Sequence, residues 1–139
     1  MKAINAVIGG EGNGGVIYPE SHYGRDALVG VGLFLSHFVA EGKSMTALKA
    51  TYPQYFISKN KLTLSPEMDV DKILEGLKQK YASEEITDID GVKIDFKDGW
   101  VHLRKSNTEP IIRIYSESKD EMAANRLAED VIKVAKSLY

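Results

Sequence analysis

The residues best suited to chemistry in this sequence gather between positions 104 and 113. They supply two guanidinium groups, two hydroxyls and one side-chain amide, carried by Arg104, Ser106, Asn107, Thr108 and Arg113. An arginine presents a planar fork of donors that fits two phosphate oxygens at once, and hydroxyl groups can donate to the remaining lone pairs. The stretch therefore predicts a phosphate or carboxylate site, with a polar hairpin turn that only connects two strands as the alternative.

The neighbouring residues indicate how this loop would be held. Strand-like runs at 100–103 and 111–115 flank it, so we expect the donors to sit on a rigid frame. Asn107 tolerates the left-handed conformation, which would turn successive backbone N–H groups toward an anion. Pro110 stiffens the exit of the loop, and the carboxylate of Glu109 should point away from a bound phosphate because the two would repel each other.

A second candidate site lies in the glycine-rich run at residues 9–15, which follows a short apolar stretch, Ile4–Ile8, that we expect to be a buried strand. Five glycines in seven residues allow the backbone to approach a ligand closely. Glu11 and Asn13 are the only side chains there that offer polar contacts, and a carboxylate with an amide suits sugar hydroxyls. A flexible glycine hinge is the alternative. A dinucleotide site is disfavoured because the glycine spacing is wrong and Glu11 would repel a pyrophosphate.

The composition changes along the chain. Residues 1–55 hold 9 of the 12 glycines but only 8 of the 38 charged side chains. We therefore divide the 139 residues near Pro53, into domains 1–53 and 54–139. A net charge of −2 and a pI near 5.9 argue against a nucleic-acid or membrane partner. The absence of cysteine excludes disulfides and fits a reducing, cytoplasmic location, and we find no signal peptide or membrane anchor.

The first domain reads as part of an α/β domain. A second short strand is expected at 16–19, and Asp26 and Ser44 are good N-caps for helices at 27–40 and 45–51, the first of which Gly42 ends. The helix at 27–40 is apolar almost all round and needs burial on more than one face. This pattern suggests that part of the surrounding domain lies outside the chain. His22 and His37 are interpreted as surface or hydrogen-bonded core histidines.

The second domain alternates strands and helices in the order β-α-β-β-β-α, which predicts an α+β fold: a four-stranded antiparallel sheet with two helices on one face. Strands are expected at 55–64, 87–96, 100–103 and 111–115, and helices from Ser65-Pro66 and from Ser118. The expected buried faces of the two helices are Val70, Ile73, Leu74, Leu77 and Tyr81, and Leu127, Val131, Val134 and Leu138. The loop at 104–110 then joins two neighbouring strands.

At this point the motifs resemble a known family. Arg-Lys-Ser-Asn-Thr-Glu-Pro at 104–110, followed by Arg113, is similar to the phosphate-binding loop in the last domain of the α-D-phosphohexomutases, the phosphoglucomutase/phosphomannomutase-like enzymes. Gly10-Glu11-Gly12-Asn13-Gly14-Gly15 looks like the sugar-binding loop of their third domain. The resemblance covers the end of domain three, at 1–53, and all of the C-terminal phosphate-binding domain, at 54–139, whose fold would be like that of the TATA-box-binding protein.

The resemblance implies a function for each site residue. Arg104, Ser106, Asn107 and Thr108, assisted by Arg113, would hold the phosphate that is not being transferred, and Glu11 and Asn13 would bind sugar hydroxyls. Many members have a histidine where this chain has Gly15, so the sugar (glucose, mannose or glucosamine) stays open. The full-length enzyme would interconvert hexose 1- and 6-phosphates through a phosphoserine and a hexose bisphosphate, with Mg²⁺ stabilising the transferring charge.

Neither the phosphoserine context nor the magnesium loop occurs in this sequence, so we assign no catalytic and no metal-binding residue. The chain is interpreted as a C-terminal fragment that lacks the N-terminal catalytic domains and is inactive alone. The first alternative is a free-standing phosphosugar-binding or regulatory module without catalysis. The second is a nucleic-acid-binding module, which the net charge and the expected lack of a basic and aromatic sheet face disfavour.

Overall fold

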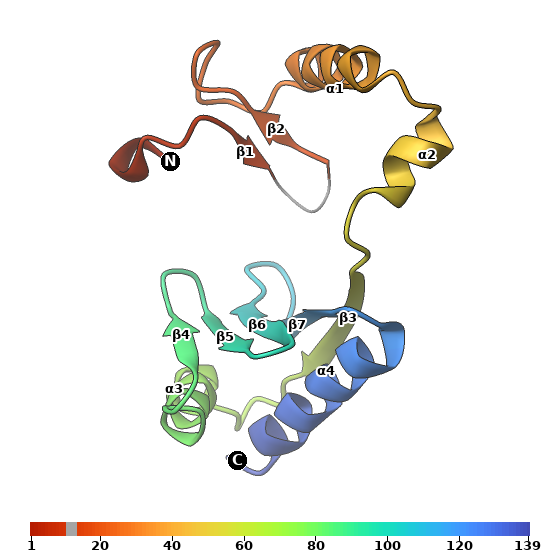
Figure 1. Cartoon of the computed structure of the whole chain (residues 1–139). Helices are drawn as coiled ribbons and strands as arrows, with labels where there is room; N and C mark the ends of the chain where they lie inside the picture. Colours follow the sequence, from red (N-terminus) through yellow and green to blue (C-terminus); the bar gives the residue numbers. More distant parts are fainter. Residues whose placement is uncertain (11–13) are drawn as a thin grey trace. The chain divides into compact units, whose positions relative to one another are not determined.

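The computed structural model describes residues 1–10 and 14–139, which divide into two compact units, Met1–Pro53 and Gln54–Tyr139 (Figure 1). No described helix combines the length and the apolar character that crossing a membrane would require. The second unit carries the candidate phosphate site.

The second unit is an α+β fold built on one antiparallel sheet, as the sequence predicts. The strands are β3 (Phe56–Thr63), β4 (Glu85–Thr87), β5 (Val92–Phe96), β6 (Gly99–Lys105) and β7 (Ile111–Ser118), in the order β3-β7-β6-β5-β4. The expected count of four strands is therefore wrong by one. Gly91, at φ +76°, turns the chain between β4 and β5, so the stretch from 85 to 96 forms a hairpin and not one strand.

Both helices of this unit, α3 (Val70–Lys80) and α4 (Glu121–Lys136), lie on the same side of the sheet (Figure 1). The core between these helices and the sheet is apolar. It consists of Leu62, Val92, Ile94, Val101, Leu103, Ile112 and Ile114 from the sheet and Val70, Ile73, Leu77, Val131 and Ala135 from the helices. Because side chains alternate along a strand, the residues between these positions project from the opposite face.

The two helices begin later than expected. The Asp69 carboxylate accepts hydrogen bonds from the N–H groups of Asp71 and Lys72, so α3 starts after Asp69 and not at Ser65-Pro66. Likewise, Asp120 accepts from the N–H of Ala123 and caps α4. Ser118 cannot cap α4 because it is the last residue of β7.

The buried face of α4 is narrower and smaller in side-chain size than the sequence suggests. Val131 is buried, whereas Leu127 and Val134 are partly buried and Leu138 lies beyond the end of the helix with 39% exposure. Alanines fill the closest approach to the sheet: Ala124, Ala128 and Ala135 are buried. The contact is close enough that the Ser116 hydroxyl of β7 donates to the Ala124 carbonyl at 2.6 Å.

The first unit contains the hairpin β1 (Gly9–Gly10) and β2 (Val16–Ile17), followed by α1 (Ala27–Glu41) and α2 (Met45–Ala50). The two predicted N-caps and the predicted stop at Gly42 are confirmed, since the side chains of Asp26 and Ser44 cap α1 and α2, and Gly42 ends α1 at φ +60°.

The predicted buried strand at Ile4–Ile8 is wrong. Lys2–Ile4 form a short 3₁₀ helix, Asn5 turns the chain at φ 49°, and Ile4 and Val7 are almost four-fifths exposed. An apolar run becomes a buried strand only where a partner strand and a covering layer are present. In the described part of the chain this run has neither, so its local turn preference decides its conformation.

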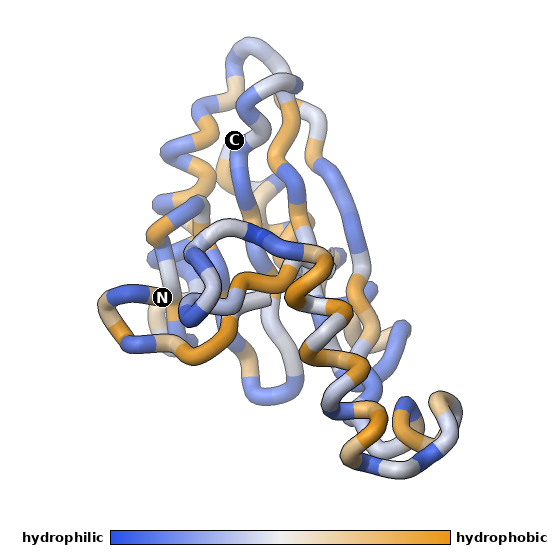
Figure 2. Tube along the Cα trace, turned by 90° about the horizontal axis from the view of Figure 1, so that it is seen from above, coloured by the Kyte–Doolittle hydropathy of each residue, from blue (hydrophilic) through white to orange (hydrophobic). Residues whose placement is uncertain are grey.

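Helix α1 has no buried residue, although its composition is strongly apolar. Leu28 is 84% exposed and Val39 is 77% exposed, and Figure 2 marks the apolar residues of the chain in orange. Its closest packing is against β2, where a β-carbon at Gly30 would lie 3.1 Å from a methyl group of Val16. A helix that is apolar on every side is typical of one covered on several faces.

The turn at Gly91 places its neighbour Asp90 beside the candidate phosphate site. It brings Asp90 against β6, where the Asp90 carbonyl lies 2.7 Å from Nε2 of His102. A β-carbon at Gly91 would lie 2.1 Å from the carbonyl oxygen of Leu103 and 3.1 Å from the Cα of Arg104. Only glycine therefore permits this approach, both by its positive φ and by its size.

We predict that Gly91→Ala lowers the free energy of unfolding by about 1 to 3 kcal/mol, because the substitution forces a backbone clash and a strained φ. Urea unfolding followed by the fluorescence of Trp100, the single tryptophan, measures this in the second unit. Gly76→Ala in α3 is the matched control: there the β-carbon meets only the side chain of Leu138, which can move. Equal stability of the two variants would contradict the prediction.

Candidate functional site

The pairing of β6 with β7 places the two predicted arginines side by side. Arg104 and Arg113 are direct Cα partners in this antiparallel pair. Their strand neighbours Leu103 and Ile112 are buried under the helices, so both guanidinium groups project from the opposite face of the sheet. Arg104 belongs to the end of β6 and not to the connecting loop, which is shorter than expected and spans 106–110.

Two cations directly opposite each other repel and destabilise a sheet by a few tenths of a kcal/mol up to about 1 kcal/mol. Asp90 offsets part of this, because its Oδ2 lies 3.0 Å from Nε of Arg104. Both partners are more than half exposed, so the pair contributes no more than about 1 kcal/mol. Arg113 has no ion pair with any residue of 1–10 or 14–139, and a bound anion would relieve the repulsion.

The connecting loop holds two hydroxyl groups together beside the arginines. Ser106 is 8% exposed, and its N–H donates to the Ile111 carbonyl at 3.0 Å. The N–H of Thr108 donates to Oγ of Ser106 at 3.4 Å, and the two hydroxyl oxygens are 3.5 Å apart. The Pro110 carbonyl accepts from the N–H of Leu64 at 2.9 Å, which ties the loop to the end of β3.

These groups surround one cavity of about 220 Å³. Its lining consists of Arg104, Lys105, Ser106, Asn107, Thr108 and Arg113. The structure thus brings together all five residues that the sequence assigns to phosphate binding, and it adds Lys105. Lys105 was not among the predicted binding residues, although its place between two predicted anion donors was a signal in the sequence. Glu109 is not part of the lining.

The expected conformation of Asn107 is wrong. Among the described non-glycine residues, only Asn5 has a positive φ, so Asn107 does not form the left-handed turn that would aim successive N–H groups at an anion. The loop turns by other means: the Ser106 hydroxyl accepts from Thr108, and the N–H of Ile111 donates to the Glu109 carbonyl at 2.8 Å. Asn107 contributes to the cavity through its side-chain amide.

A larger hollow, of about 790 Å³, runs along the outer side of α4. Both of its cations already face a carboxylate, since Asp130 lies 3.4 Å from Nζ of Lys133 and 3.9 Å from Nε of Arg126. Its lining has three carboxylates, from Asp120, Glu129 and Asp130, against two cations, so it offers no excess of anion donors. The smaller cavity at the end of β6 is therefore the better candidate for binding an anion.

The face of the sheet opposite the helices carries aromatic and basic side chains, so the expectation that no such face exists is wrong. The rings of this face are nevertheless engaged within the chain. Trp100 donates from Nε1 to Oε1 of Glu117 at 3.1 Å, Lys59 lies 5.7 Å from the ring centre of Tyr115, and Lys93 lies 5.7 Å from that of Trp100. Rings covered in this way are poor platforms for stacked bases.

The candidate sugar-binding residues Glu11 and Asn13 lie outside the described residues. The strands that bracket this part of the sequence are placed: Gly9 pairs with Ile17 and Gly10 with Val16. Two of the glycines therefore form a short strand. Pairing needs only the backbone, and that is available to glycine.

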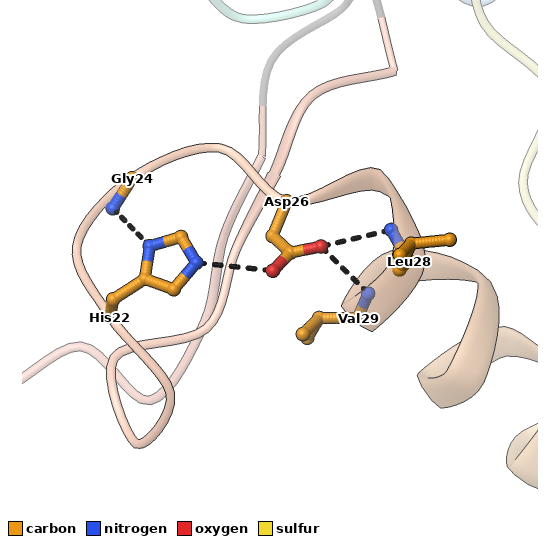
Figure 3. Close-up of polar contacts among 5 residues, drawn as sticks. All are labelled: His22, Gly24, Asp26, Leu28 and Val29. Atoms are coloured by element: carbon orange, nitrogen blue, oxygen red, sulfur yellow. Dashed lines mark hydrogen bonds and ion pairs between the residues drawn. The ribbon is translucent and has the colours of Figure 1, made fainter.

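His22 has a structural role at the start of α1 (Figure 3). Its Nδ1 accepts from the N–H of Gly24 at 3.0 Å, so Nε2 carries the proton and donates to Oδ2 of Asp26 at 3.1 Å. The other Asp26 oxygen accepts from the N–H groups of Leu28 and Val29 at 2.9 and 3.0 Å. The hydrogen bond from Val29, followed by that from His22, holds the pKa of Asp26 below its usual value.

His37, Asp88 and Asp90 are also engaged in the fold. His37 Nε2 lies 2.9 Å from the hydroxyl of Tyr52, which fits the interpretation of a hydrogen-bonded histidine. Asp88 pairs with Lys78 at 3.2 Å, and Asp90 pairs with Arg104. Within 1–10 and 14–139, no three acidic or histidine side chains gather closely enough to hold a metal ion.

Comparison with known proteins matches both units to one family. Residues 1–55 match the family model described as phosphoglucomutase/phosphomannomutase, alpha/beta/alpha domain III, and residues 60–134 match that of the phosphoglucomutase/phosphomannomutase C-terminal domain. The second match alone covers more than half of the chain, and the two together follow its division into two units.

Individual relatives agree. A phosphoglucosamine/phosphogalactosamine mutase of Sulfurisphaera tokodaii is 40% identical over 132 residues, which are 94% of this chain and 29% of the relative. A phosphoglucomutase/phosphomannomutase of Thermococcus kodakarensis is also 40% identical over 132 residues, 94% of this chain and 28% of the relative. A crystal structure of a phosphoglucomutase/phosphomannomutase family protein from Burkholderia thailandensis superposes with a TM-score of 0.71 at 25% identity, over 99% of this chain and 29% of that one. The chain thus spans less than a third of the length of these relatives.

We predict that Asp26 titrates below its ordinary value of 3.8 and that His22→Ala raises this pKa without fully restoring it, because the backbone donors remain. Carbon-13 shifts of the carboxyl group in the full chain measure both values. A lowered pKa means that the cap stabilises α1 above the ordinary value and loses this contribution as the pH falls through the lowered pKa. Identical titration of Asp26 in both proteins would contradict the role given to His22.

Proposed function

Because this chain belongs to the phosphoglucomutase/phosphomannomutase family, we propose that it is the substrate-recognition part of a phosphosugar mutase. The whole enzyme would interconvert hexose 1-phosphate and hexose 6-phosphate through a phosphoserine and a hexose bisphosphate. The relatives are named as mutases, which supports an isomerase of this type for the longer protein. This chain would bind the substrate, and the N-terminal catalytic domains of the longer protein would carry the phosphoserine.

The observation that carries the proposal is the cavity between the ends of β6 and β7. Two directly opposed guanidinium groups, two hydroxyls and an amide line it, and among the described residues a carboxylate partner exists for Arg104 but not for Arg113. A phosphate group offers enough acceptor oxygens for all these donors and would relieve the repulsion between the arginines. In the proposed role, this cavity holds the phosphate that is not being transferred.

Holding that phosphate would serve catalysis by positioning. A mutase must present first one end of the sugar and then the other to the same phosphoryl donor, and a fixed distal phosphate limits the ways in which the sugar can lie. Ser106 is suited to binding in this scheme, because its hydroxyl is nearly buried and lies beside Thr108. We therefore assign no catalytic residue to this chain.

Sugar recognition is proposed for Glu11 and Asn13 on the sequence argument, since a carboxylate and an amide together can accept from and donate to hydroxyl groups. Gly15 lacks the side chain that a histidine would provide in many members of the family. The sugar therefore remains open among glucose, mannose and glucosamine.

We propose that magnesium is bound by other domains of the longer protein. The described residues do not form a ligand set that suits Mg²⁺. We propose that its ligands lie in the catalytic domains, and that the enzyme works in the cytoplasm, as the lack of cysteine suggests. The exposed apolar surface of α1 favours this arrangement over a free-standing regulatory module, which would leave that helix in water.

We predict that the chain binds glucose 6-phosphate weakly, with a dissociation constant on the order of 1 mM, since it spans less than a third of the length of its relatives. Arg104→Ala should weaken binding at least about thirtyfold, because it removes a bidentate, charge-assisted contact worth roughly 2 kcal/mol or more. Isothermal titration calorimetry measures both. Arg126→Ala, which removes an 83%-exposed arginine on α4, is the control and should bind like the wild type. Equal affinity of the Arg104 variant would exclude this cavity as the site.

The same purified chain tests whether substrate binding and phosphoryl transfer belong to different domains. Purified chain at high concentration, with Mg²⁺ and a trace of hexose bisphosphate, should not convert glucose 1-phosphate or mannose 1-phosphate. Measurable conversion above a denatured sample would overturn the assignment of catalysis to other domains.

A further inference from the structure

The cationic row at the phosphate cavity continues onto a third strand. Strand β3 is the other neighbour of β7, and Lys61 is the direct Cα partner of Arg113. The next residue, Leu62, is 5% exposed on the side of the helices, so Lys61 projects from the same face as the two arginines. Lys61, Arg113 and Arg104 thus form one straight row across β3, β7 and β6.

Three cations in such a row are unfavourable without an anion. Neighbouring strands lie about 4.8 Å apart, and like charges directly opposite destabilise a sheet. Asp90 pairs with Arg104 at one end of the row. In the part of the chain that the structure describes, neither Arg113 nor Lys61 has an ion pair.

The other lysines of this face show a different pattern. Lys93 pairs with the carboxylate of Asp95, its neighbour on β5. Lys59, two residues before Lys61 on β3, lies over the ring of Tyr115. The two lysines of the neighbouring row therefore have partners within the chain, whereas among residues 1–10 and 14–139 neither Lys61 nor Arg113 has one. The uncompensated charge lies beside the cavity that the connecting loop encloses.

The backbone fixes the position of Lys61 relative to this cavity. Thr63 pairs with Ile111 at the start of β7, and the N–H of Leu64 donates to the Pro110 carbonyl at 2.9 Å. The end of β3 and the loop at 106–110 are thereby held together. Lys61 lies one residue pair along the ladder from Leu62 and Ile112, and its four-carbon side chain has the reach to approach an anion held by Arg113.

We propose that Lys61 is a further anion-binding residue of the phosphate cavity, acting on the side of Arg113 away from Arg104. The inference rests on the proposed function of that cavity and extends it. A lysine is a point charge on a flexible stem and provides little directional recognition. Lys61 therefore selects for charge: with the two arginines it favours a phosphate monoester, which carries about −1.5 to −2 at pH 7, over a singly charged anion.

The test compares Lys61→Met with Lys59→Met in the full chain, by calorimetric titration with glucose 6-phosphate and with glucose 6-sulfate, a singly charged analogue. We expect Lys61→Met to weaken phosphate binding about three- to tenfold, to reduce the preference for phosphate over sulfate, and to flatten the salt dependence. Lys59→Met, on the same strand and face, should stay within about twofold of the wild type, and Lys61→Arg should retain the affinity. Circular dichroism verifies that each variant is folded.

The outcomes separate this inference from the proposed function. If Arg104→Ala loses binding while Lys61→Met binds like the wild type, the cavity stands and the role of Lys61 is wrong. If Lys59→Met weakens binding as much as Lys61→Met, the effect is a general property of a basic face and the assignment to Lys61 is also wrong. If neither Arg104 nor Lys61 affects binding, the proposed function fails together with the inference.

Discussion

The antiparallel register between β6 and β7 is the constraint on which the candidate site depends. It sets Arg104 opposite Arg113, and through the pairing of β7 with β3 it sets Lys61 in the same row. No single strand contains this arrangement, since the three residues are far apart in the sequence. A slip of one residue would turn every side chain of a strand to the other face and would direct a guanidinium group into the apolar core.

The core is what keeps this register. Ile112 and Ile114 of β7 and Val101 and Leu103 of β6 are fully buried beneath α3 and α4, and they alternate with the polar residues of the opposite face. The repulsion between the cations is tolerated because burying these side chains stabilises the sheet by far more, about 1.5 to 3 kcal/mol for each large aliphatic group. The fold thus holds in place a site that would be unfavourable on its own, as is common where ligands bind.

Much of this fold could be predicted from the sequence because the signals are local. Asp26, Ser44 and Gly42 mark helix ends by the hydrogen bonds and φ angles that their side chains allow, and the apolar period of α3 identifies its buried face. The errors arise where tertiary context decides. Ser118 is a residue type that often caps helices, but here it pairs with Phe56 as the last residue of β7. The apolar run at Ile4–Ile8 has no partner strand within the described residues.

The same distinction applies to the site. The cluster of hydrogen-bond donors at 104–108 could be predicted as an anion site from the sequence, because so many anion-binding side chains between two strands are uncommon. Asp90 and Lys61 could not, since their proximity follows from strand pairing. The register of β5 on β6 places Asp90, and the register of β3 on β7 places Lys61. Glu11 and Asn13 stay predictions of the sequence.

The most direct test of this account is a nitrogen-15 NMR titration of the full chain with inorganic phosphate. Shift changes should concentrate on the amides at 104–108 and at Arg113 and should saturate together with one dissociation constant. They should be absent when chloride replaces phosphate at equal ionic strength. Changes that centre on the hollow along α4, or that spread evenly over all lysine-bearing surfaces, would show that the opposed arginines are not the anion site.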